Sequence, residues 1–435
     1  MPRFTSYPPA TWFSADVTPE TVRGWRAALP DGAEISLYLH VPFCRRLCWF
    51  CACRTQGTKT DAPLAPYVDD LLAEARQVRA DLPDRVTVTR LHLGGGTPTL
   101  LPPAEMDRLL SGLAEVFGAR ARDEFSVEID PTEFGPARAE VLAAHGLNRA
   151  SIGVQDFDPR VQAAIGRSQS AAQTAEAVAL LRGAGVEGLN IDLLYGLPHQ
   201  TKESLRATLD QVLEIGPTRL ALYGYAHVPW MSKRQVMIPA DALPGPEARF
   251  DLFNSASHHL RAAGFAQVGI DHFARPGDGL ATALADHRLA RSFQGYTDDR
   301  TPTLIGLGAS AISHYAQGYA QNRPGTGAWS DAVRKGEGAT ARGIAMTADQ
   351  ALRARLIEEL MCYFAVDLDR IEPGERAAAR ALLTPLAQRY PEAISLAGDR
   401  LVLAGWARPL VRIFAAEVGG ERPTGMGQAS YSAAV

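Results

Sequence analysis

The most informative part of this chain is the stretch Tyr38-Leu39-His40-Val41-Pro42-Phe43-Cys44-Arg45-Arg46-Leu47-Cys48-Trp49-Phe50-Cys51-Ala52-Cys53. It begins as a predicted strand and ends in a loop. Of the 5 cysteines in the chain, only Cys362 lies outside it. Cys362 is expected to pack as a small buried hydrophobe, whereas four thiols so close together indicate a bound group.

Three kinds of site could use these thiols. A disulfide is disfavoured, because a cytosolic compartment keeps thiols reduced. Structural zinc usually draws two distant Cys or His pairs, but here all four sulfurs share one loop and no matching pair follows. Closely spaced thiolates in one loop can wrap an iron–sulfur core. We therefore favour an iron–sulfur cluster over zinc.

Around this loop, the first half of the chain alternates predicted strands with segments of helical period. The predicted strands are residues 35–41, 86–93, 124–129, 149–154, 189–194 and 219–225. Six strands that are each followed by a helix require a parallel sheet with right-handed crossovers. The fold class is therefore α/β, either an open sheet or a full or partial barrel. In both, ligands gather at the carboxyl ends of the strands.

Polar and glycine residues follow several of these strands. Residues 94–98, Gly-Gly-Gly-Thr-Pro, follow the second strand, and Glu128 ends the third. Gln155 and Asp156 end the fourth. Asp192 lies within an apolar run, where a carboxylate is costly unless it is hydrogen-bonded. Each has an ordinary structural explanation, as a turn, a cap or a solvated face, but together they indicate a ligand site.

The second half of the chain predicts a smaller domain. Residues 239–247 read as a linker or long loop, 250–262 as a helix and 266–273 as a strand. Helices over 347–363 and 373–389 and a hairpin over 393–403 indicate a small, mainly helical C-terminal domain. We expect an N-terminal arm over 1–33, a catalytic barrel with extensions over 34–335 and the C-terminal domain over 336–435. Residues 423–435 are expected to be mobile.

Composition limits the class of protein. The chain has 435 residues, with 44 Lys+Arg against 48 Asp+Glu and a net charge of -4. Nothing in this balance suggests a surface for nucleic acid or for an anionic membrane. No apolar run approaches the ~18–20 residues of a membrane span, and the start does not resemble a secretory signal. A cytoplasmic protein is expected.

The spacing Cys44-x3-Cys48-x-Phe50-Cys51 resembles the signature of the radical S-adenosylmethionine (radical SAM) enzymes. The resemblance implies a partial (β/α)6 barrel in which Cys44, Cys48 and Cys51 hold a [4Fe–4S] cluster. In that family the remaining iron binds the amino and carboxylate groups of S-adenosylmethionine. One electron then cleaves the sulfonium and yields a 5′-deoxyadenosyl radical, which abstracts a hydrogen atom.

Further motifs resemble one family within this superfamily, the oxygen-independent coproporphyrinogen III oxidases. They are Cys53 after the triad and the segments 3–8, 154–157, 190–193, 225–227, 271–276, 293–297 and 308–313. The resemblance implies decarboxylation of two propionates of coproporphyrinogen III to vinyl groups, with two S-adenosylmethionines consumed. The alternative is a heme chaperone of the same superfamily; these relatives generally lack the fourth cysteine. Family members usually carry a further segment ahead of Arg3, which puts a lid-like element in question here.

Carried over position by position, the resemblance assigns the site. Residues expected to meet the cluster-bound S-adenosylmethionine are Tyr38, Gly95, Glu128 and Ile312. Those expected to meet a second S-adenosylmethionine are Phe50, Gly96, Thr97, Gln155, Arg167, Asp192 and Ala226. Cys53 is expected to act in catalysis without binding iron. Arg275 is expected to contact a substrate propionate, because arginine pairs well with carboxylates. An electron donor, an electron acceptor and a monomeric state complete the expectations.

Overall fold

The computed structural model describes residues 6–420. The tail expected to be mobile, 423–435, lies outside this range. The chain forms two compact units. The barrel unit holds residues 14–263 and 301–344, and the second unit holds the described residues up to 13, 264–300 and those from 345 onward. Each unit combines segments that are distant in sequence. The expected division into three consecutive domains follows the order of the sequence instead, and it stays a prediction.

All six predicted strands are present in the barrel unit. They are β1 (Ala33–Val41), β4 (Val86–Gly95), β5 (Glu124–Ile129), β6 (Arg149–Gln155), β7 (Gly188–Tyr195) and β8 (Arg219–Gly224). They pair in parallel in this order. On the other side, β1 pairs in parallel with β13 (Leu304–Leu307). The sheet then continues through β14 (Ile312–Tyr315), β15 (Gly318–Asn322) and β16 (Thr340–Ala345).

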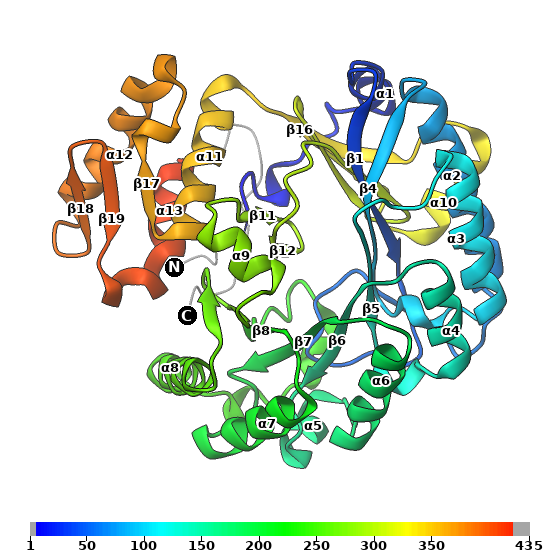
Figure 1. Cartoon of the computed structure of the whole chain (residues 1–435), viewed down its shortest axis with the longest axis horizontal. Helices are drawn as coiled ribbons and strands as arrows, with labels where there is room; N and C mark the ends of the chain where they lie inside the picture. Colours follow the sequence, from blue (N-terminus) through cyan, green and yellow to red (C-terminus); the bar gives the residue numbers. More distant parts are fainter. Residues whose placement is uncertain (1–5, 421–435) are drawn as a thin grey trace. The chain divides into compact units, whose positions relative to one another are not determined.

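The crossover helices cover the outer side of this curved sheet (Figure 1). They are α2 (Leu64–Asp81), α3 (Pro103–Phe117), α4 (Pro136–Ala144), α5 (Pro159–Ile165), α6 (Ala171–Gly183) and α7 (Lys202–Ile215). The unit also contains α1 (Pro19–Ala27), α8 (Pro246–Ala262) and α10 (Thr326–Lys335). Thr201 caps α7, with its side chain accepting from the backbone N–H of Ser204. These features confirm the predicted partial β/α barrel.

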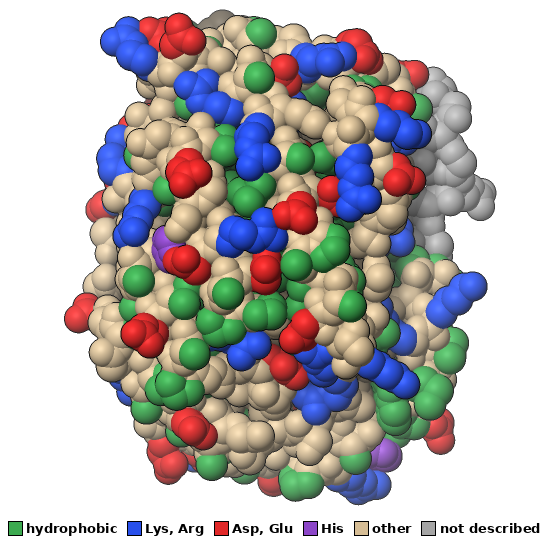
Figure 2. All heavy atoms as spheres, turned by 90° about the vertical axis from the view of Figure 1, so that its right-hand side faces the viewer, with side chains coloured by type: hydrophobic (Ala, Val, Ile, Leu, Met, Phe, Trp, Pro, Cys, Tyr) green, Lys and Arg blue, Asp and Glu red, His purple; other side chains and the backbone are tan. Residues whose placement is uncertain are grey.

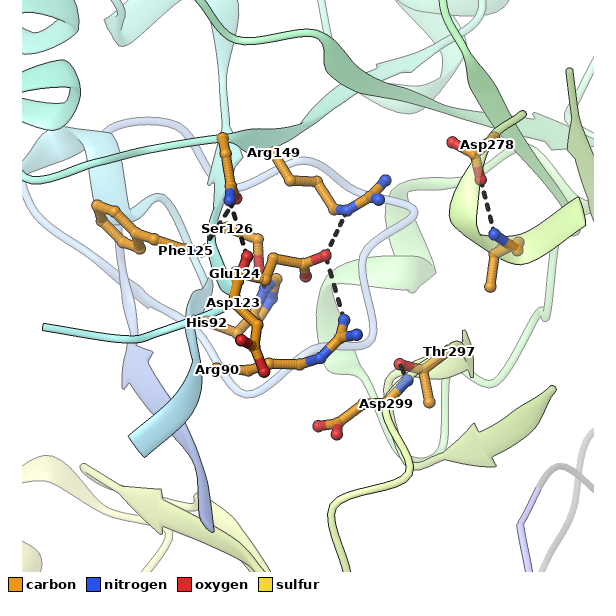
Figure 3. Close-up of polar contacts among 12 residues, drawn as sticks. Arg90, His92, Asp123, Glu124, Phe125, Ser126, Arg149, Asp278, Thr297 and Asp299 are labelled. Carbon is orange, nitrogen blue, oxygen red and sulfur yellow. Dashed lines mark hydrogen bonds and ion pairs between the residues drawn. The ribbon is translucent and has the colours of Figure 1, made fainter. Parts of the chain in front are cut away.

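Along the strands of the barrel, alternate side chains point to opposite faces of the sheet, so that apolar side chains line the outer face and polar side chains line the inner face. On β5, Phe125, Val127 and Ile129 are buried, while Glu124 and Glu128 alternate with them on the other face. Figure 3 shows the Glu124 carboxylate between two guanidinium groups, 3.2 Å from Arg90 and 2.8 Å from Arg149. The inner face of the sheet is therefore polar from the start of these strands to their carboxyl ends.

The second unit confirms most of the predicted C-terminal elements. It contains α9 (Gly279–Ala285), α11 (Ala348–Tyr363), α12 (Arg376–Arg389) and α13 (Val411–Gly419). A three-stranded sheet has the order β17 (Ala365–Asp367), β19 (Arg400–Leu403), β18 (Ile394–Ala397), so the predicted hairpin is present. A further hairpin joins β11 (Ala290–Ser292) and β12 (Gly295–Thr297). No helix within residues 6–420 has the length and apolarity that a membrane crossing needs.

Two local predictions were wrong. The single strand expected over 266–273 is an antiparallel hairpin of β9 (Ala266–Val268) and β10 (His272–Ala274). The chain reverses at Gly269, whose φ of 57° suits glycine. The linker expected over 239–247 is not continuous loop either, because it contains a short 3-10 helix (Ala240–Ala242) and α8 begins at Pro246. Proline suits that position, since the first helical N–H has no partner.

Candidate functional site

The cysteine loop leaves the carboxyl end of β1 and crosses the same end of β4. Cys44 ends the short strand β2 (Phe43–Cys44), which pairs with β3 (Gln56–Gly57) beyond the loop. Cys48 is buried, Cys44 and Cys51 are half-buried, and Cys53 is exposed. The loop is held to the barrel by the Trp49 N–H, which donates to the carbonyl of Ile165 at 2.9 Å. The thiols thus lie at the ligand-binding edge of the sheet.

Close packing requires glycine at the end of β4, where Gly94 and Gly95 close the strand and Gly96 follows it. A Cβ at Gly94 would stand 2.9 Å from a Glu128 carboxylate oxygen, and one at Gly95 would stand 2.8 Å from the His40 ring. A Cβ at Gly96 would stand 2.7 Å from the Phe43 carbonyl oxygen. Larger residues would therefore displace the cysteine loop or Glu128.

The thiols differ in their electrostatic surroundings. Burial raises the pKa of Cys44 to about 11. Cys51 has its pKa lowered to about 6, chiefly because it accepts a hydrogen bond from the Cys53 thiol, while burial opposes the shift. The same hydrogen bond keeps Cys53 protonated and raises its pKa. Metal binding would deprotonate the ligating thiols.

The chemistry of the donor set fits an iron–sulfur cluster. One loop carries all three thiols, with Cys48 buried and Cys44 and Cys51 half-buried, and thiolates that share one loop are typical ligands of such a cluster. Cys44, Cys48 and Cys51 would hold the cluster, in accord with the sequence-based preference over zinc.

Glu128 lies next to this loop as a half-buried anion. One carboxylate oxygen accepts from the Gly95 N–H at 2.9 Å, and the other lies 3.6 Å from Nε2 of His92. Burial acts to raise the pKa of Glu128, but His92 and the Gly95 N–H outweigh it, so the pKa is lowered. The Tyr38 ring stacks on His92 with centroids 5.6 Å apart. This arrangement keeps a fixed negative charge beside the cysteine loop, where an amino group could bind.

Arg167 joins the cysteine loop to the neighbouring strands. Its Nη1 lies 3.4 Å from the Cys48 sulfur and 3.3 Å from a carboxylate oxygen of Asp130, and its Nη2 donates to the Gly153 carbonyl at 2.6 Å. Gln155, at the end of β6, has a φ of 74°, an uncommon conformation for a residue other than glycine. Such strain is often found at binding sites.

The two carboxylates singled out in the fourth and fifth strands have different surroundings. Asp192 accepts from the Ser151 hydroxyl at 2.9 Å and from the Asn190 side-chain amide at 2.8 Å. These bonds meet the requirement that a carboxylate in an apolar run be hydrogen-bonded. Asp156 is fully buried and accepts from Gln200 at 2.6 Å and Thr208 at 2.7 Å. Asp156 therefore braces the barrel wall instead of facing a ligand.

The sequence analysis missed Gln235, which connects two of the expected cofactor contacts. Its side-chain amide donates to the carbonyl of Phe50 at 2.7 Å and to that of Ala226 at 3.1 Å. The same side chain accepts from the Val228 N–H at 2.5 Å. A polar residue in an irregular segment gives no sequence signal, so only the fold identifies this role.

Helix α2 contributes a second set of residues that the sequence did not indicate. Tyr67 donates to the His40 carbonyl at 2.7 Å and accepts from the Ala309 N–H at 3.0 Å. Glu74 accepts from the Gly308 N–H at 2.7 Å and from the Asn322 side chain at 2.7 Å. Burial raises the pKa of Glu74 to about 7, against the effect of these bonds. Tyr67 and Glu74 thus fix the loop 308–311, which leads into Ile312, and tie it to the end of β1.

All expected site residues except one lie in the barrel unit, within its strands or in the segments that follow them. Arg275 is the exception, because it belongs to the second unit. Its guanidinium lies 4.5 Å above the centre of the Phe265 ring. Neighbouring His272 lies in β10, 2.8 Å from a carboxylate oxygen of Asp271, which also pairs with Arg412 at 3.2 Å. A role for Arg275 in substrate binding stays a prediction.

Comparison with known proteins places this geometry in context. Residues 38–212 match the family model of the radical SAM superfamily. The oxygen-independent coproporphyrinogen III oxidase of Paracoccus denitrificans is 51% identical over 419 residues, which cover 95% of this chain and 93% of that protein. The enzyme of the same name from Cereibacter sphaeroides is 48% identical with the same coverage.

A solved structure shows the same likeness in three dimensions. Coproporphyrinogen III oxidase from Escherichia coli, described as a radical SAM enzyme, superposes with a TM-score of 0.90. The two chains are 36% identical, and the match covers 96% of this chain and 97% of the other. The likeness therefore includes the second unit as well as the barrel.

Proposed function

Because the chain belongs to the oxygen-independent coproporphyrinogen III oxidases of the radical SAM superfamily, we propose that it converts coproporphyrinogen III to protoporphyrinogen IX without oxygen. The reaction belongs to heme biosynthesis and removes two propionate carboxyl groups as CO2, leaving two vinyl groups. The observation that carries this proposal is 51% identity over 95% of the chain, since the radical SAM region alone covers only residues 38–212.

The barrel residues have definite tasks in this proposal. Cys44, Cys48 and Cys51 would hold the [4Fe–4S] cluster. With S-adenosylmethionine bound, the cluster supplies one-electron cleavage of the sulfonium and a radical that abstracts a hydrogen atom from a propionate. Glu128 offers a half-buried carboxylate to a cationic amino group, and the Gly95 N–H fixes its orientation. The polar inner face positions the reactants while the outer apolar layer excludes water.

The remaining expected residues fit the same site as further cofactor contacts. Asp192 is oriented by Ser151 and Asn190, and a carboxylate held in this way suits a ribose hydroxyl or an amino group. Arg167 suits a carboxylate, because its Nε is buried without a protein partner. The assignment of individual residues to a first or second S-adenosylmethionine is part of the proposal, as are a monomeric state and external electron carriers.

An anaerobic assay tests this function. Reconstituted protein is incubated with coproporphyrinogen III, S-adenosylmethionine and dithionite, and porphyrins, methionine and 5′-deoxyadenosine are quantified. We expect about two molecules of each cleavage product per protoporphyrinogen formed, one per propionate. Tight heme binding without vinyl formation or substrate-dependent cleavage would instead indicate the heme-chaperone alternative.

Cys53 provides a specific prediction. Cys53→Ala is expected to keep about four irons per chain but to lose turnover, because the family resemblance assigns Cys53 a catalytic role without iron and the Cys53 thiol is hydrogen-bonded to Cys51. Iron analysis and the anaerobic assay on one preparation measure both properties. Loss of iron in this variant would mean that the ligand trio is assigned incorrectly.

A second prediction concerns Glu74. Glu74→Gln is expected to raise the Kd of S-adenosylmethionine about tenfold, or about 1.4 kcal/mol, because it weakens the bonds that hold the loop before Ile312. Equilibrium binding to the reconstituted enzyme measures this effect.

The matched control for Glu74→Gln is Asp70→Asn. Asp70 is a buried carboxylate on the same helix, but it pairs with Arg334 on α10 at 2.8 Å. The Asp70→Asn variant should have a lower thermal stability and an unchanged Kd for S-adenosylmethionine. Equal Kd changes in both variants would show that the effect is general destabilisation of α2.

A further inference from the structure

The cysteine loop is covered on one side by a segment from a distant part of the chain. This segment, 228–240, follows β8 and includes a short 3-10 helix (Lys233–Met237). The Ser232 hydroxyl donates to the Cys51 carbonyl at 2.9 Å, and Gln235 donates to the Phe50 carbonyl at 2.7 Å. Arg234 Nη1 donates to the Thr55 hydroxyl at 2.9 Å. The segment is thus bonded directly to the backbone between the expected iron ligands.

The two segments 42–60 and 228–240 together form what we name the cluster-loop surface. Within residues 6–420, seven large hydrophobic side chains are exposed, and five of them belong to this surface. The five, between 38% and 70% exposed, are Leu47, Trp230, Met231, Val236 and Met237. A soluble protein rarely gathers such side chains at its surface unless they bind a partner. Trp and Met are also enriched in protein interfaces, where methionine adapts readily to different shapes.

The charged residues of these two segments all have one sign. The segments contain six cations, which are Arg45, Arg46, Arg54, Lys59, Lys233 and Arg234, and no Asp or Glu, although the whole chain has a net charge of -4. Two carboxylates outside the segments face them: Asp61 pairs with Arg45, and Glu133 lies near Arg45 and Arg46. By contrast, cations and anions are interspersed on the outer face shown in Figure 2. A positive field around an apolar patch attracts and orients a negatively charged protein.

The proposed reaction explains why a partner should bind at this point. Each cleavage of S-adenosylmethionine needs one electron from outside the protein, and it must enter through the cluster. A carrier that docks on the cluster-loop surface would lie directly over the carbonyls of Phe50 and Cys51. No other segment described in residues 6–420 combines this position with an exposed apolar patch and a uniform charge.

We propose that the cluster-loop surface is the docking site for a small acidic protein that carries single electrons at low potential. This inference rests on the proposed function. The carrier would lose one electron, and the cluster that Cys44, Cys48 and Cys51 would hold would take it up. This electron is the one that reductive cleavage of S-adenosylmethionine requires. A small contact of mixed apolar and charged character is typical of transient electron-transfer complexes.

Two double variants test the proposal on the full-length, reconstituted enzyme. Trp230→Ala with Met231→Ala removes apolar contact, and Lys59→Glu with Lys233→Glu reverses charge. Matched controls in the second unit are Trp406→Ala, which removes an equally exposed tryptophan, and Arg400→Glu. The probe is a purified acidic flavodoxin. Its Kd is measured in the oxidised form, and stopped-flow absorbance follows cluster bleaching by its hydroquinone.

The proposal predicts a distinct pattern. The apolar variant should weaken flavodoxin binding about tenfold, and the charge variant should slow bleaching about tenfold at low salt, with the difference vanishing near 0.5 M salt. Turnover with dithionite should match that of the unmodified enzyme, because a small reductant needs no docking surface. The controls should behave as the unmodified enzyme in every measurement.

Other outcomes would overturn the proposal. One such outcome is that both variants bind flavodoxin, and are bleached by it, as the unmodified enzyme is. Another is that the control variants lose as much flavodoxin affinity and bleaching rate as the test variants. A raised KM for coproporphyrinogen III with unchanged flavodoxin binding would instead assign the surface to the substrate. Failure of the proposed function gives a different result. In that case the unmodified enzyme shows no turnover with dithionite, whereas flavodoxin binding and cluster bleaching still test the docking site.

Discussion

Replacing Cys44, Cys48 or Cys51 with alanine is expected to reduce bound iron from about four atoms per chain to less than one, and to abolish turnover. Each thiolate would bind a different iron, so no remaining pair can retain the cluster. Cys53 is not expected to replace the lost ligand, because it lies two residues beyond Cys51 and outside the Cys44-x3-Cys48-x-Phe50-Cys51 spacing. Iron analysis after anaerobic reconstitution and the visible absorbance band measure the loss.

Cys362→Ala is the matched control for these three variants. Cys362 is buried among apolar side chains of the second unit, as the sequence predicted. Its removal is expected to lower thermal stability slightly and to leave the iron content unchanged. If all three trio variants retained full iron, the ligand assignment would be incorrect.

Glu128→Gln is expected to weaken binding of S-adenosylmethionine about 10- to 100-fold, with turnover falling at least as far. The substitution keeps the shape of the side chain but removes a half-buried charge, and hydrogen bonds to charged groups contribute ~1.5–3 kcal/mol. Equilibrium binding to the reconstituted protein and the change in its EPR signal on cofactor addition measure the effect.

The pH dependence of binding follows from the lowered pKa of Glu128. A carboxylate with a depressed pKa loses its charge only when the pH falls through that lower value. Glu128 should therefore stay ionised from about pH 8 down to about pH 5, and it should cause no change in cofactor affinity across that range.

Glu124→Gln is the matched control for Glu128→Gln, since Glu124 lies four residues earlier on the same strand and therefore on the same face of it. It pairs with Arg90 and Arg149 instead of the glycine run. Its loss should lower stability and leave the cofactor Kd within about twofold, less than the ~1 kcal/mol typical of a lost hydrogen bond. Unchanged affinity in Glu128→Gln would remove Glu128 from the cofactor site.

Much of the barrel could be predicted because its signals are local. The six strands were located within two residues of their observed ends, since each is a short apolar run between helical segments. The hairpin around Gly269 was missed because each of its strands has only three residues, too few to show a separate apolar pattern. The discontinuous composition of both units also has no local signal, because it depends on which distant segments pack together.

The candidate site divides in the same way. Sequence spacing identified the cysteine trio, and strand ends identified Glu128 and Asp192. The sequence analysis also singled out Asp156, but in the structure Asp156 accepts hydrogen bonds from Gln200 and Thr208 in the barrel wall. Gln235, Tyr67 and Glu74 were not identified, although each is hydrogen-bonded to the backbone beside an expected cofactor contact.

The sequence by itself determined the chemistry of this protein, because thiol spacing and the order of strands and helices are properties of neighbouring residues. Tertiary structure alone decided which carboxylates stay charged beside the cysteine loop and which residues hold that loop. It also decided that segment 228–240 covers the loop. These outcomes depend on burial and on hydrogen bonds between residues up to about two hundred positions apart, whose free energies exist only when the chain is folded.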